Sequence, residues 1–521
     1  MKLDRLNEYV LATTVVVCGV LLAIICGRFA GTGQNFWLWL IAGIVIYLLA
    51  CFWLRTKTWV LILVFWSWSG QLNSVPGHMP VRDLVVGGVV VFFFTLKAFK
   101  VIRYRPSYSW LDIIMGLNVL YIIALYLRYP IGVNAFGSEN VGGRPYIEII
   151  FALGAYWVLN QVFLMPKRIY WFPFVLCASA IFFFVLDTFT YLVPSTVPIL
   201  GKLYGGVDAE SYRREEAGDD TDEGDVRTIY LADAGTKLIN IMSSYFSPLT
   251  FINPMYFWRF LAFFIAIFFC LKSGHRITIP AIAAAILLTT YFRNGIAAVI
   301  IMILIAIPPA VVAIAGQGRL YELPHSIQRT LCFLPGEWNP DVLNEAEGSI
   351  DWRVEMWDEM MHEDKYIHDK VFGDGFGFTR EQLEDMAFGG TQEDFMETNS
   401  PHSGPISTIR VSGYVGFGLF VLLLFGCCVR SWRLIRMTKG TKFFPVCLFV
   451  GVPTIYSSIG FVFIFGDYKN DILSTILGVG ILNILSRSFA AYQRSIEEPP
   501  PAPALKKTVQ PLAPMPMPAL H

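Results

Sequence analysis

The chain has 521 residues, of which 55% are hydrophobic and only 15% are charged, and its mean hydropathy is +0.54. Because soluble chains carry about 25% charged residues, this composition excludes an ordinary soluble protein. The 40 basic and 40 acidic side chains cancel, so no basic field points to nucleic acid. The nine cysteines form no CxxC pair, and eight of them lie in or beside apolar runs, so we expect no disulfide framework.

Apolar runs long enough to cross a bilayer recur along the whole sequence. A crossing helix needs about 20 apolar residues, because in lipid its backbone groups must bond to one another. The runs lie near 10–27, 36–54, 58–74, 84–99, 109–127, 146–164, 169–193, 256–271, 277–307, 406–429, 443–465 and 471–489. The first follows Lys2 and Arg5, but no small-residue cleavage site comes after it, so we expect an uncleaved span. The sequence therefore predicts an all-α polytopic membrane protein with about twelve transmembrane helices.

Lysine and arginine gather between alternate runs, and this sets the expected orientation. Under the positive-inside rule, the loops that carry them lie in the cytoplasm, together with both termini. The segments 128–145, 194–255 and 308–405 then face outward.

The apolar stretch 277–315 has two interpretations. Taken as one long, broken crossing at 277–307, it is ended by Pro308 and Pro309. Two spans around Arg293 would instead put the last large loop inside, which the basic cluster at 430–442 disfavours. With one crossing, the predicted parts are N-terminal spans at 1–193, an acidic outward loop at 194–255, central spans at 256–307, a large extracytoplasmic loop between the ninth and tenth spans at 308–405, C-terminal spans at 406–489 and a Pro-rich cytoplasmic tail at 490–521.

Two of the polar segments carry no chemistry that we can name. Residues 208–225 hold nine acids against Arg213 and Arg214, which is typical of a solvated loop. The tail at 497–521 is rich in proline, and we expect it to be disordered in the cytoplasm.

Arg293 lies inside an otherwise apolar stretch. A charge at that depth costs about 2.5–3.5 kcal/mol or more, so it normally faces a wet cavity or a partner. The ordinary alternative is an arginine that extends to the outer headgroups. Asn294 and Gly295 follow it and loosen the helix, which favours a cavity.

In the large loop, Arg353 and Trp357 are four residues apart, which puts them on one face of a helix. A basic group beside an indole suits a phosphate or a sugar, although an amphipathic loop helix with no ligand gives the same spacing. His362 and His368 are six apart, a poor spacing for two metal ligands on one helix, so no metal site is predicted. The glycines of 373–377 predict a turn.

His402 comes just before the tenth apolar run, with Ser403 and Pro405 after it. Pro405 suits the first turn of a helix, and the partial positive charge at such a helix end suits a diphosphate. Histidine can accept a proton at neutral pH, although a lone loop histidine often has no such role. Gly413 and Gly416 further along leave a smooth face on which a helix or a lipid chain could pack.

Together these motifs resemble the O-antigen ligase/polymerase family of bacterial envelope enzymes. The family motif is His, then Asn, Ser or Gln, nine residues, Gly, two residues, and Gly, Thr or Val. His402-Ser403, Gly413 and Gly416 fit every fixed position. The family also has an arginine after an apolar run, often as Ser-Arg-Gly, which Arg293 matches more loosely. An Arg, a nearby Trp and a Gly-x-Gly-x-Gly turn then correspond to Arg353, Trp357 and 373–377, so the resemblance covers roughly 277–425.

The resemblance implies a GT-C-like fold and a metal-independent glycosyltransferase with no cofactor, on the outer face of the bacterial inner membrane. The donor would be a glycan on undecaprenyl diphosphate. The acceptor would be a sugar hydroxyl, on lipid A–core in a ligase or on a second lipid-linked glycan in a polymerase. The sequence leaves both acceptors open.

The same chemistry suggests roles for the candidate residues. His402 is the expected general base, and Arg293 and Arg353 are expected to bind the diphosphate. Further candidates for substrate binding are Trp357, Ser403, Gly413 and Gly416, with Arg410 and Arg259 as additional phosphate binders.

Two other classes of function stay open. A transporter or flippase for a lipid-linked glycan would place ionisable groups along several spans, and Asp112, Glu148, Asp187 and Arg259 do lie in or at the ends of spans. A non-catalytic membrane scaffold could use the acidic loop and the Pro-rich tail. A scaffold should tolerate changes at His402, whereas an enzyme should not.

Overall fold

The computed structural model describes most of the chain as helices. It covers residues 35–68, 70, 80–102, 108–130, 143–203, 229–364, 366–377 and 401–497, and no strand occurs among them. Seven helices in this part are long and apolar enough to cross a membrane, or up to eight if one bent pair counts as a span. The described part is therefore all-α and belongs to a membrane protein, and it holds fewer candidate spans than the twelve predicted. The first predicted run, 10–27, lies outside the described residues.

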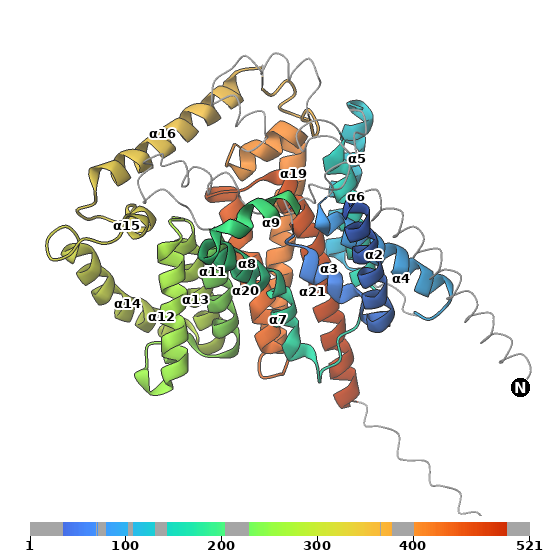
Figure 1. Cartoon of the computed structure of the whole chain (residues 1–521), viewed down its shortest axis with the longest axis horizontal. Coiled ribbons are helices and arrows are strands. Elements are labelled where there is room, and N and C mark those ends of the chain that lie inside the picture. The colour runs from blue at the N-terminus through green and yellow to red at the C-terminus, as the bar shows by residue number, and fades with distance from the viewer. Residues whose placement is uncertain are drawn as a thin grey trace, which may run out of the picture.

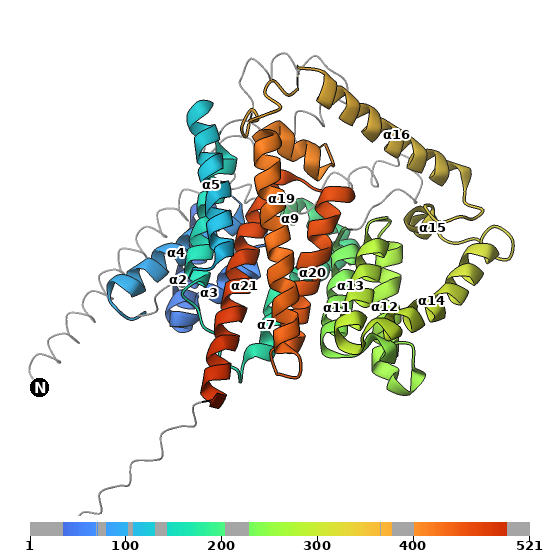
Figure 2. The same cartoon turned by 180° about the vertical axis from the view of Figure 1, so that it is seen from behind.

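Figures 1 and 2 show the helices in two views related by a half turn. In chain order they are α2 (Asn35–Leu54), α3 (Trp59–Phe65), α4 (Val81–Ala98), α5 (Trp110–Arg128), α6 (Arg144–Leu159), α7 (Phe172–Leu176), α8 (Ala178–Leu192), α9 (Val197–Leu203), α11 (Ile229–Tyr245), α12 (Phe257–Lys272), α13 (Thr278–Asn294), α14 (Ile296–Gly316), α15 (His325–Leu331), α16 (Pro340–His362), α19 (Gly404–Thr438), α20 (Phe444–Phe463) and α21 (Tyr468–Glu497). Short 3-10 turns lie at Arg55–Lys57, Ile169–Trp171, Pro194–Thr196, Pro248–Thr250 and Pro254–Tyr256.

Two groups of helices make up the bundle. In the first, α19 packs against α5, α20 and α21, and α21 packs against α6. In the second, α11 packs against α8, α12, α13 and α20, and α14 packs on α13 at the outside (Figure 2). Apolar side chains fill the contacts between these helices, as expected for helices that are apolar on nearly every side.

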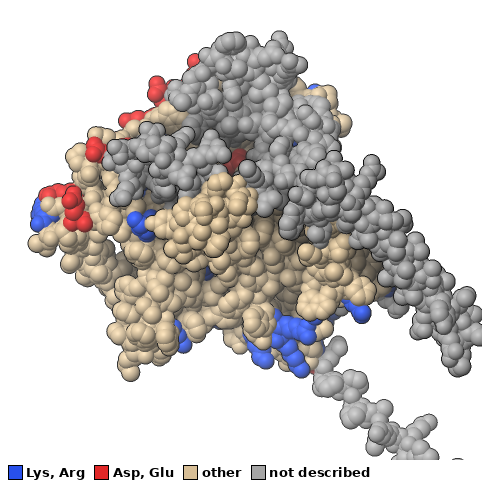
Figure 3. All heavy atoms as spheres, viewed as in Figure 1, with Lys and Arg blue, Asp and Glu red and all other residues tan. Residues whose placement is uncertain are grey.

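The bundle has two ends of opposite charge. We call the end at which α16 crosses the bundle the α16 end, and the opposite end, which holds the α19–α20 turn, the basic end (Figure 1). The basic end carries Arg433, Arg436, Lys439 and Lys442. In Figure 3, Lys and Arg gather mainly along the lower edge of the molecule, and Asp and Glu gather along the upper left, where Figure 1 places α16.

The predicted crossing at 277–307 is two helices. α13 ends at Asn294, and Gly295 takes φ 88° and ψ −179°, a conformation open to glycine because it has no Cβ. α14 then continues through Pro308 and Pro309 to Gly316. Membrane helices tolerate such prolines because local adjustment satisfies the freed backbone groups. The alternative of two segments around Arg293 describes the structure better than the predicted single crossing.

The predicted outward loop at 194–255 contains a helix that packs inside the bundle. α11 buries Ile239 and Met242 against its neighbours, and Asn240 donates to the Tyr456 hydroxyl at 3.3 Å. Its sequence also holds Lys237, 3.9 Å from the carboxylate of Asp233. These polar residues kept 229–245 below the hydropathy of a predicted span. The acidic segment 208–225 lies outside the described residues.

The additional helix reverses α12 and α13 relative to the predicted directions. The turn between them lies at the α16 end, because Thr330 of α15 donates to Leu271 O at 2.9 Å and Arg276 donates to Ala346 O of α16 at 3.5 Å. Lys272 and Arg276 were predicted at the opposite end. Because α14 adds one more crossing, α15 and α16 still follow at the end predicted for the large loop.

Two other boundaries differ from the prediction. α21 runs to Glu497, so the first residues of the predicted tail at 490–521 are helical, and 498–521 lie outside the described part. In the third predicted run, 58–74, the helix among the described residues is the seven-residue α3, bent by 116° from the helix before it.

Candidate functional site

Residues 366–377, which we call the glycine loop, pack against the first turns of α19 through their backbones. α19 breaks at Gly413, where φ is 63° and ψ is −175°, and this break frees carbonyl and amide groups of the helix. Four hydrogen bonds join the two segments: Asp374 N to Arg410 O (3.1 Å), Gly375 N to Val411 O (2.8 Å), Tyr414 N to Lys370 O (2.9 Å) and Val415 N to Val371 O (3.2 Å). The loop therefore takes the place of the missing helical hydrogen bonds.

Glycine is required on both sides of this contact. A Cβ on Gly413 would overlap the carbonyl oxygen of Val371, and a Cβ on Gly373 would lie 2.5 Å from Gly413 N. Gly416, one turn later, faces Tyr121 of α5, whose ring would lie 2.9 Å from an added Cβ. Gly413 thus contacts the glycine loop instead of a lipid chain, while Gly416 permits close packing of another helix.

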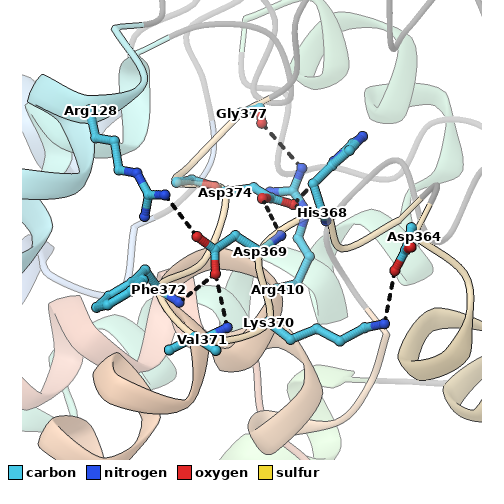
Figure 4. Close-up of polar contacts among 11 residues, drawn as sticks. Arg128, Asp364, His368, Asp369, Lys370, Val371, Phe372, Asp374, Gly377 and Arg410 are labelled. Atoms are coloured by element: carbon cyan, nitrogen blue, oxygen red, sulfur yellow. Dashed lines mark hydrogen bonds and ion pairs between the residues drawn. The ribbon is translucent and has the colours of Figure 1, made fainter.

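Arg410 fixes the glycine loop from below (Figure 4). Its side chain is only 2% exposed, and its guanidinium donates to Gly375 O at 3.0 Å and to Gly377 O at 3.2 Å. The two glycines have φ of 81° and 87°, so the carbonyls of a left-handed turn face the arginine. We predicted that Arg410 binds phosphate, but here it orders the loop.

The side chains of two aspartates in the glycine loop accept hydrogen bonds from backbone amides of the same loop (Figure 4). Asp374 accepts from the amides of His368 (2.9 Å) and Asp369 (3.1 Å). Asp369 Oδ1 accepts from the amides of Val371 and Phe372, while its Oδ2 lies 2.9 Å from Arg128 Nη2 of α5. The amide of Phe372, the amide of Val371 and the Arg128 guanidinium hold the pKa of Asp369 below its ordinary value. Sequence analysis missed this role, although aspartates beside glycines are a recognised turn signal.

Two substitutions of Asp369 should distinguish how much its ion pair with Arg128 and how much its hydrogen bonds to the turn contribute to stability. Asp369→Asn keeps Oδ1 for the two amides and loses the charge that faces Arg128, whereas Asp369→Ala loses both. Thermal unfolding in detergent at pH 7 should show a larger loss of Tm for Asp369→Ala than for Asp369→Asn. The pKa of Asp369 is lower in the folded protein than in the unfolded chain. Its carboxylate therefore stabilises the fold at pH values above the ordinary pKa of about 3.9, and this stabilisation is lost as the pH falls through the pKa of the folded protein. A wild-type advantage over Asp369→Asn that stays constant below pH 4 would contradict this account.

His402 lies between α16 and the turn that joins α20 to α21. Its backbone φ is +53°, an uncommon value for a residue other than glycine, and its side chain is partly exposed. The imidazole stacks on Phe465, with centroids 5.4 Å apart and planes at 26°. The indole N–H of Trp357 donates to Pro401 O at 2.7 Å. Trp357 therefore positions the residue directly before His402.

Arg353 reaches the same end of the bundle from α16. It lies one helical turn before Trp357, so the two residues share a face, and it is partly buried. The neighbouring Met356 and Met360 are buried against Ile409 at the start of α19. This packing holds α16 over the segment that begins with Ser403, the residue before the first turn of α19.

The turn at 464–467 is a part of the site that sequence analysis missed. Besides the Phe465 contact, the amide of Tyr468 donates to Ser407 Oγ at 3.1 Å, and a Cβ on Gly466 would lie 2.9 Å from Gly404 Cα. Asp467 follows directly, and burial raises the pKa of its carboxyl. The available signal was a Gly-Asp pair between two apolar runs, on the side predicted to face outward.

Arg293 lies at the other end of the bundle from His402. Its guanidinium donates to Ser243 O at 3.0 Å and to Ser244 O, and it stacks on Phe444 at the start of α20, 5.3 Å from the ring centroid. The adjacent Phe292 contacts Trp432 near the end of α19, with centroids 4.7 Å apart.

The length of α19 separates this arginine from the histidine. At 1.5 Å per residue, the helix from Gly413 to Trp432 alone spans about 28 Å, and His402 lies beyond Gly413. Arg293 instead caps the carbonyl end of α11. Arg259 also lies at the basic end, where it stacks on Phe246. The structure therefore places His402, Ser403, Arg353, Trp357, Arg410, Gly413 and Gly416 in the half of the bundle toward the α16 end, and leaves Arg293 and Arg259 at the basic end.

The described residues contain no group of three His, Cys, Asp or Glu side chains that could hold a metal ion. The site consists of a histidine, an arginine and the polar groups of a helix start, all at one end of a membrane bundle. Neither a model of a known protein family nor a curated protein matches the chain.

Proposed function

We propose that the chain is a membrane glycosyltransferase of the O-antigen ligase/polymerase type. It would transfer a glycan from undecaprenyl diphosphate to a sugar hydroxyl, without a metal, at the α16 end of a GT-C-like bundle. The observation that carries this proposal is the placement of His402: Trp357 anchors the residue before it, Phe465 stacks on its ring, and Arg353 lies one turn from Trp357.

The charge difference between the two ends supports an orientation. Cytoplasmic loops carry an excess of Lys and Arg, so the basic end would face the cytoplasm and the α16 end the periplasm of a bacterial inner membrane. Lys272 and Arg276 depart from this rule, since they lie at the α16 end. The lipid chain of a donor would then lie in the bilayer beside the bundle, with its diphosphate at the level of His402.

The reaction poses two chemical problems, and residues at this end could solve both. The acceptor hydroxyl must lose its proton as its oxygen bonds to the anomeric carbon, and His402 would take that proton. The bond from the anomeric carbon to the diphosphate oxygen breaks, and the diphosphate leaves with the electron pair. Arg353 would bind the departing diphosphate through charge-assisted hydrogen bonds. The first-turn amides of α19, next to Ser403, would add partial positive charge.

The arrangement of the other arginines supports Arg353 as the diphosphate ligand. Arg410 is engaged by two carbonyls of the glycine loop, and Arg293 is engaged at the basic end. Of the four arginines considered for phosphate binding, Arg353 is the one that α16 carries to the end of the bundle at which His402 lies.

The ionisable groups within the spans favour an enzyme over a transporter. Glu148 pairs with Arg144 at 3.2 Å and with Arg82 at 3.3 Å, near the start of α6. Asp112 accepts from the Tyr156 hydroxyl and from Asn483, in a different place along the bundle. These groups form separate clusters, each satisfied by its own partners, whereas a transport path would join them.

The activity can be tested with the purified chain in nanodiscs. The protein would receive a glycan on undecaprenyl diphosphate and one candidate acceptor at a time, and release of undecaprenyl diphosphate would be followed. We expect release that depends on the acceptor. A product that grows in length would identify a polymerase, and a conjugate with lipid A–core would identify a ligase. Translocation of the donor without release would overturn the proposal in favour of a transporter.

Arg353→Lys should impair transfer although it keeps the positive charge. Lysine lacks the planar fork that binds two phosphate oxygens at once, so we expect kcat/KM to fall by about tenfold to a hundredfold. Arg319→Lys is the matched control, because Arg319 is an exposed arginine at the same end that pairs with Glu337. If Arg353→Lys keeps full activity while Arg319→Lys also does, bidentate binding by Arg353 is excluded.

A further inference from the structure

The segment before and at the start of α12 presents four large apolar side chains in succession. Met255, Tyr256, Phe257 and Trp258 are 89%, 46%, 58% and 77% exposed. They begin the candidate span Pro254–Lys272. Aromatic residues at the end of a membrane helix lie at the level of the lipid headgroups, where their rings contact both the chains and the polar layer. We call residues 255–258 the apolar collar.

Arg259 lies beside this collar, with its guanidinium against two aromatic rings. Its guanidinium carbon lies 4.0 Å from the ring centroid of Phe246 and 4.7 Å from that of Tyr256. Its one polar contact among the described residues is a long bond from Nη1 to Thr250 Oγ1, at 3.4 Å. No carboxylate of the described part lies within ion-pair distance of it. The two rings fix the cation and leave the edges of the guanidinium plane for an anion.

Arg293 provides a contrast at the same end of the bundle. Its guanidinium donates to two carbonyl oxygens that end α11, Ser243 O and Ser244 O. The Arg293 guanidinium is therefore hydrogen-bonded to groups of the protein itself. Arg259 is the member of the pair with donors left for a ligand.

The chemistry of the ligand follows from charge and depth. A guanidinium plane matches two oxygens of a phosphate, and the collar beside it matches the glycerol and the upper acyl chain of a lipid. The choline headgroup carries its own cation next to its phosphate, whereas an anionic lipid leaves the phosphate charge uncompensated. An anionic lipid therefore gains more from Arg259.

We propose that Arg259 and the apolar collar form a binding site for the phosphate of an anionic glycerophospholipid at the basic end of the bundle. The site is separate from His402 and lies at the opposite end of the bundle. The glycan donor is not needed to measure it, so the outcome is independent of the proposed glycosyl transfer.

Native mass spectrometry of the protein released from nanodiscs can test the site. With a mixture of phosphatidylglycerol and phosphatidylcholine, the wild type should retain phosphatidylglycerol. Arg259→Ala should weaken that binding by about tenfold to a hundredfold, the effect of losing a charge-assisted hydrogen-bonded pair. Arg259→Lys should lie between the two. Arg319→Ala, at the other end of the bundle, should bind like the wild type.

Two further measurements guard against a folding artefact and against another ligand. Trp258→Ala removes an exposed ring and should also weaken retention, at unchanged Tm. Inorganic phosphate at millimolar concentration should not displace the lipid. The proposal is overturned if Arg259→Ala retains as much phosphatidylglycerol as the wild type, if phosphatidylcholine is retained equally well, or if free phosphate competes.

Discussion

Replacing His402 by asparagine should lower the rate of glycan transfer by about 10²–10⁴, the usual contribution of a general base. This range corresponds to about 3–5 kcal/mol of transition-state stabilisation. Asparagine is the informative choice because it tolerates the left-handed conformation that His402 adopts at φ +53°. The backbone is therefore kept while the basic nitrogen is lost. Release of undecaprenyl diphosphate by the variant, at matched Tm, is the measurement.

A second histidine supplies the control. His368 lies in the glycine loop at the same end of the bundle, and its side chain is largely exposed. His368→Asn should keep the activity of the wild type. Equal release by His402→Asn and the wild type would remove His402 from the mechanism, whereas loss in both variants would point to a general effect on the loop.

Substitution of Gly413 by alanine should cause the largest loss of stability in the C-terminal half. The backbone of Gly413, at φ 63° and ψ −175°, lies in a region that is essentially restricted to glycine and costs other residues about 1–3 kcal/mol. The added methyl group would also overlap Val371 O. This backbone atom cannot easily move away, because four backbone hydrogen bonds hold the glycine loop against α19. We expect a loss of about 3 kcal/mol or more in the free energy of unfolding.

Gly418, five residues further along the same helix, is the matched control. No atom lies within 4 Å of a Cβ added there, so Gly418→Ala should be neutral or slightly stabilising through helix propensity. Thermal unfolding of both variants in one detergent makes the comparison. A Tm for Gly413→Ala equal to that of Gly418→Ala would show that the break in α19 does not depend on glycine.

The helices of the C-terminal half were predictable because they are apolar over their whole length. The runs 406–429, 443–465 and 471–489 correspond to α19, α20 and α21, with α19 and α21 extending further at their polar ends. Hydropathy failed where a helix inside the bundle carries polar side chains that have partners. α11, with Asp233, Lys237 and Asn240, is the clearest case.

The candidate site was predictable where its parts are close in the sequence. Arg353 and Trp357 share a helix face, and both precede His402 in one polar segment, so one end of the bundle receives all three. The position of Arg293 could not be predicted in this way. The end at which it lies depends on the number of crossings before it, and one missed helix, α11, moved it to the basic end.

The contacts that order the glycine loop could not be predicted from the sequence either. Arg410 and Gly377 are 33 residues apart, and they meet because α19 bends at Gly413. The spacing of Gly413 and Gly416 suggested a smooth helix face, and it gave no indication that the first of the two ends the regular helix. A glycine with positive φ and a glycine at a packing contact look the same in one sequence.

The break at Gly413 has a consequence for how the chain is built during synthesis. The groups that this break frees pair with residues 370–375 and with the Tyr121 hydroxyl of α5, which donates to Ser412 O at 3.0 Å, and unpaired backbone groups in lipid cost several kcal/mol. Translation proceeds from the N-terminus, so the ribosome completes the glycine loop before α19 emerges. α19 can therefore reach its final packing once that loop has docked on α5 through Asp369 and Arg128. A delay in this docking would hold the last three helices in an immature state, open to membrane proteases.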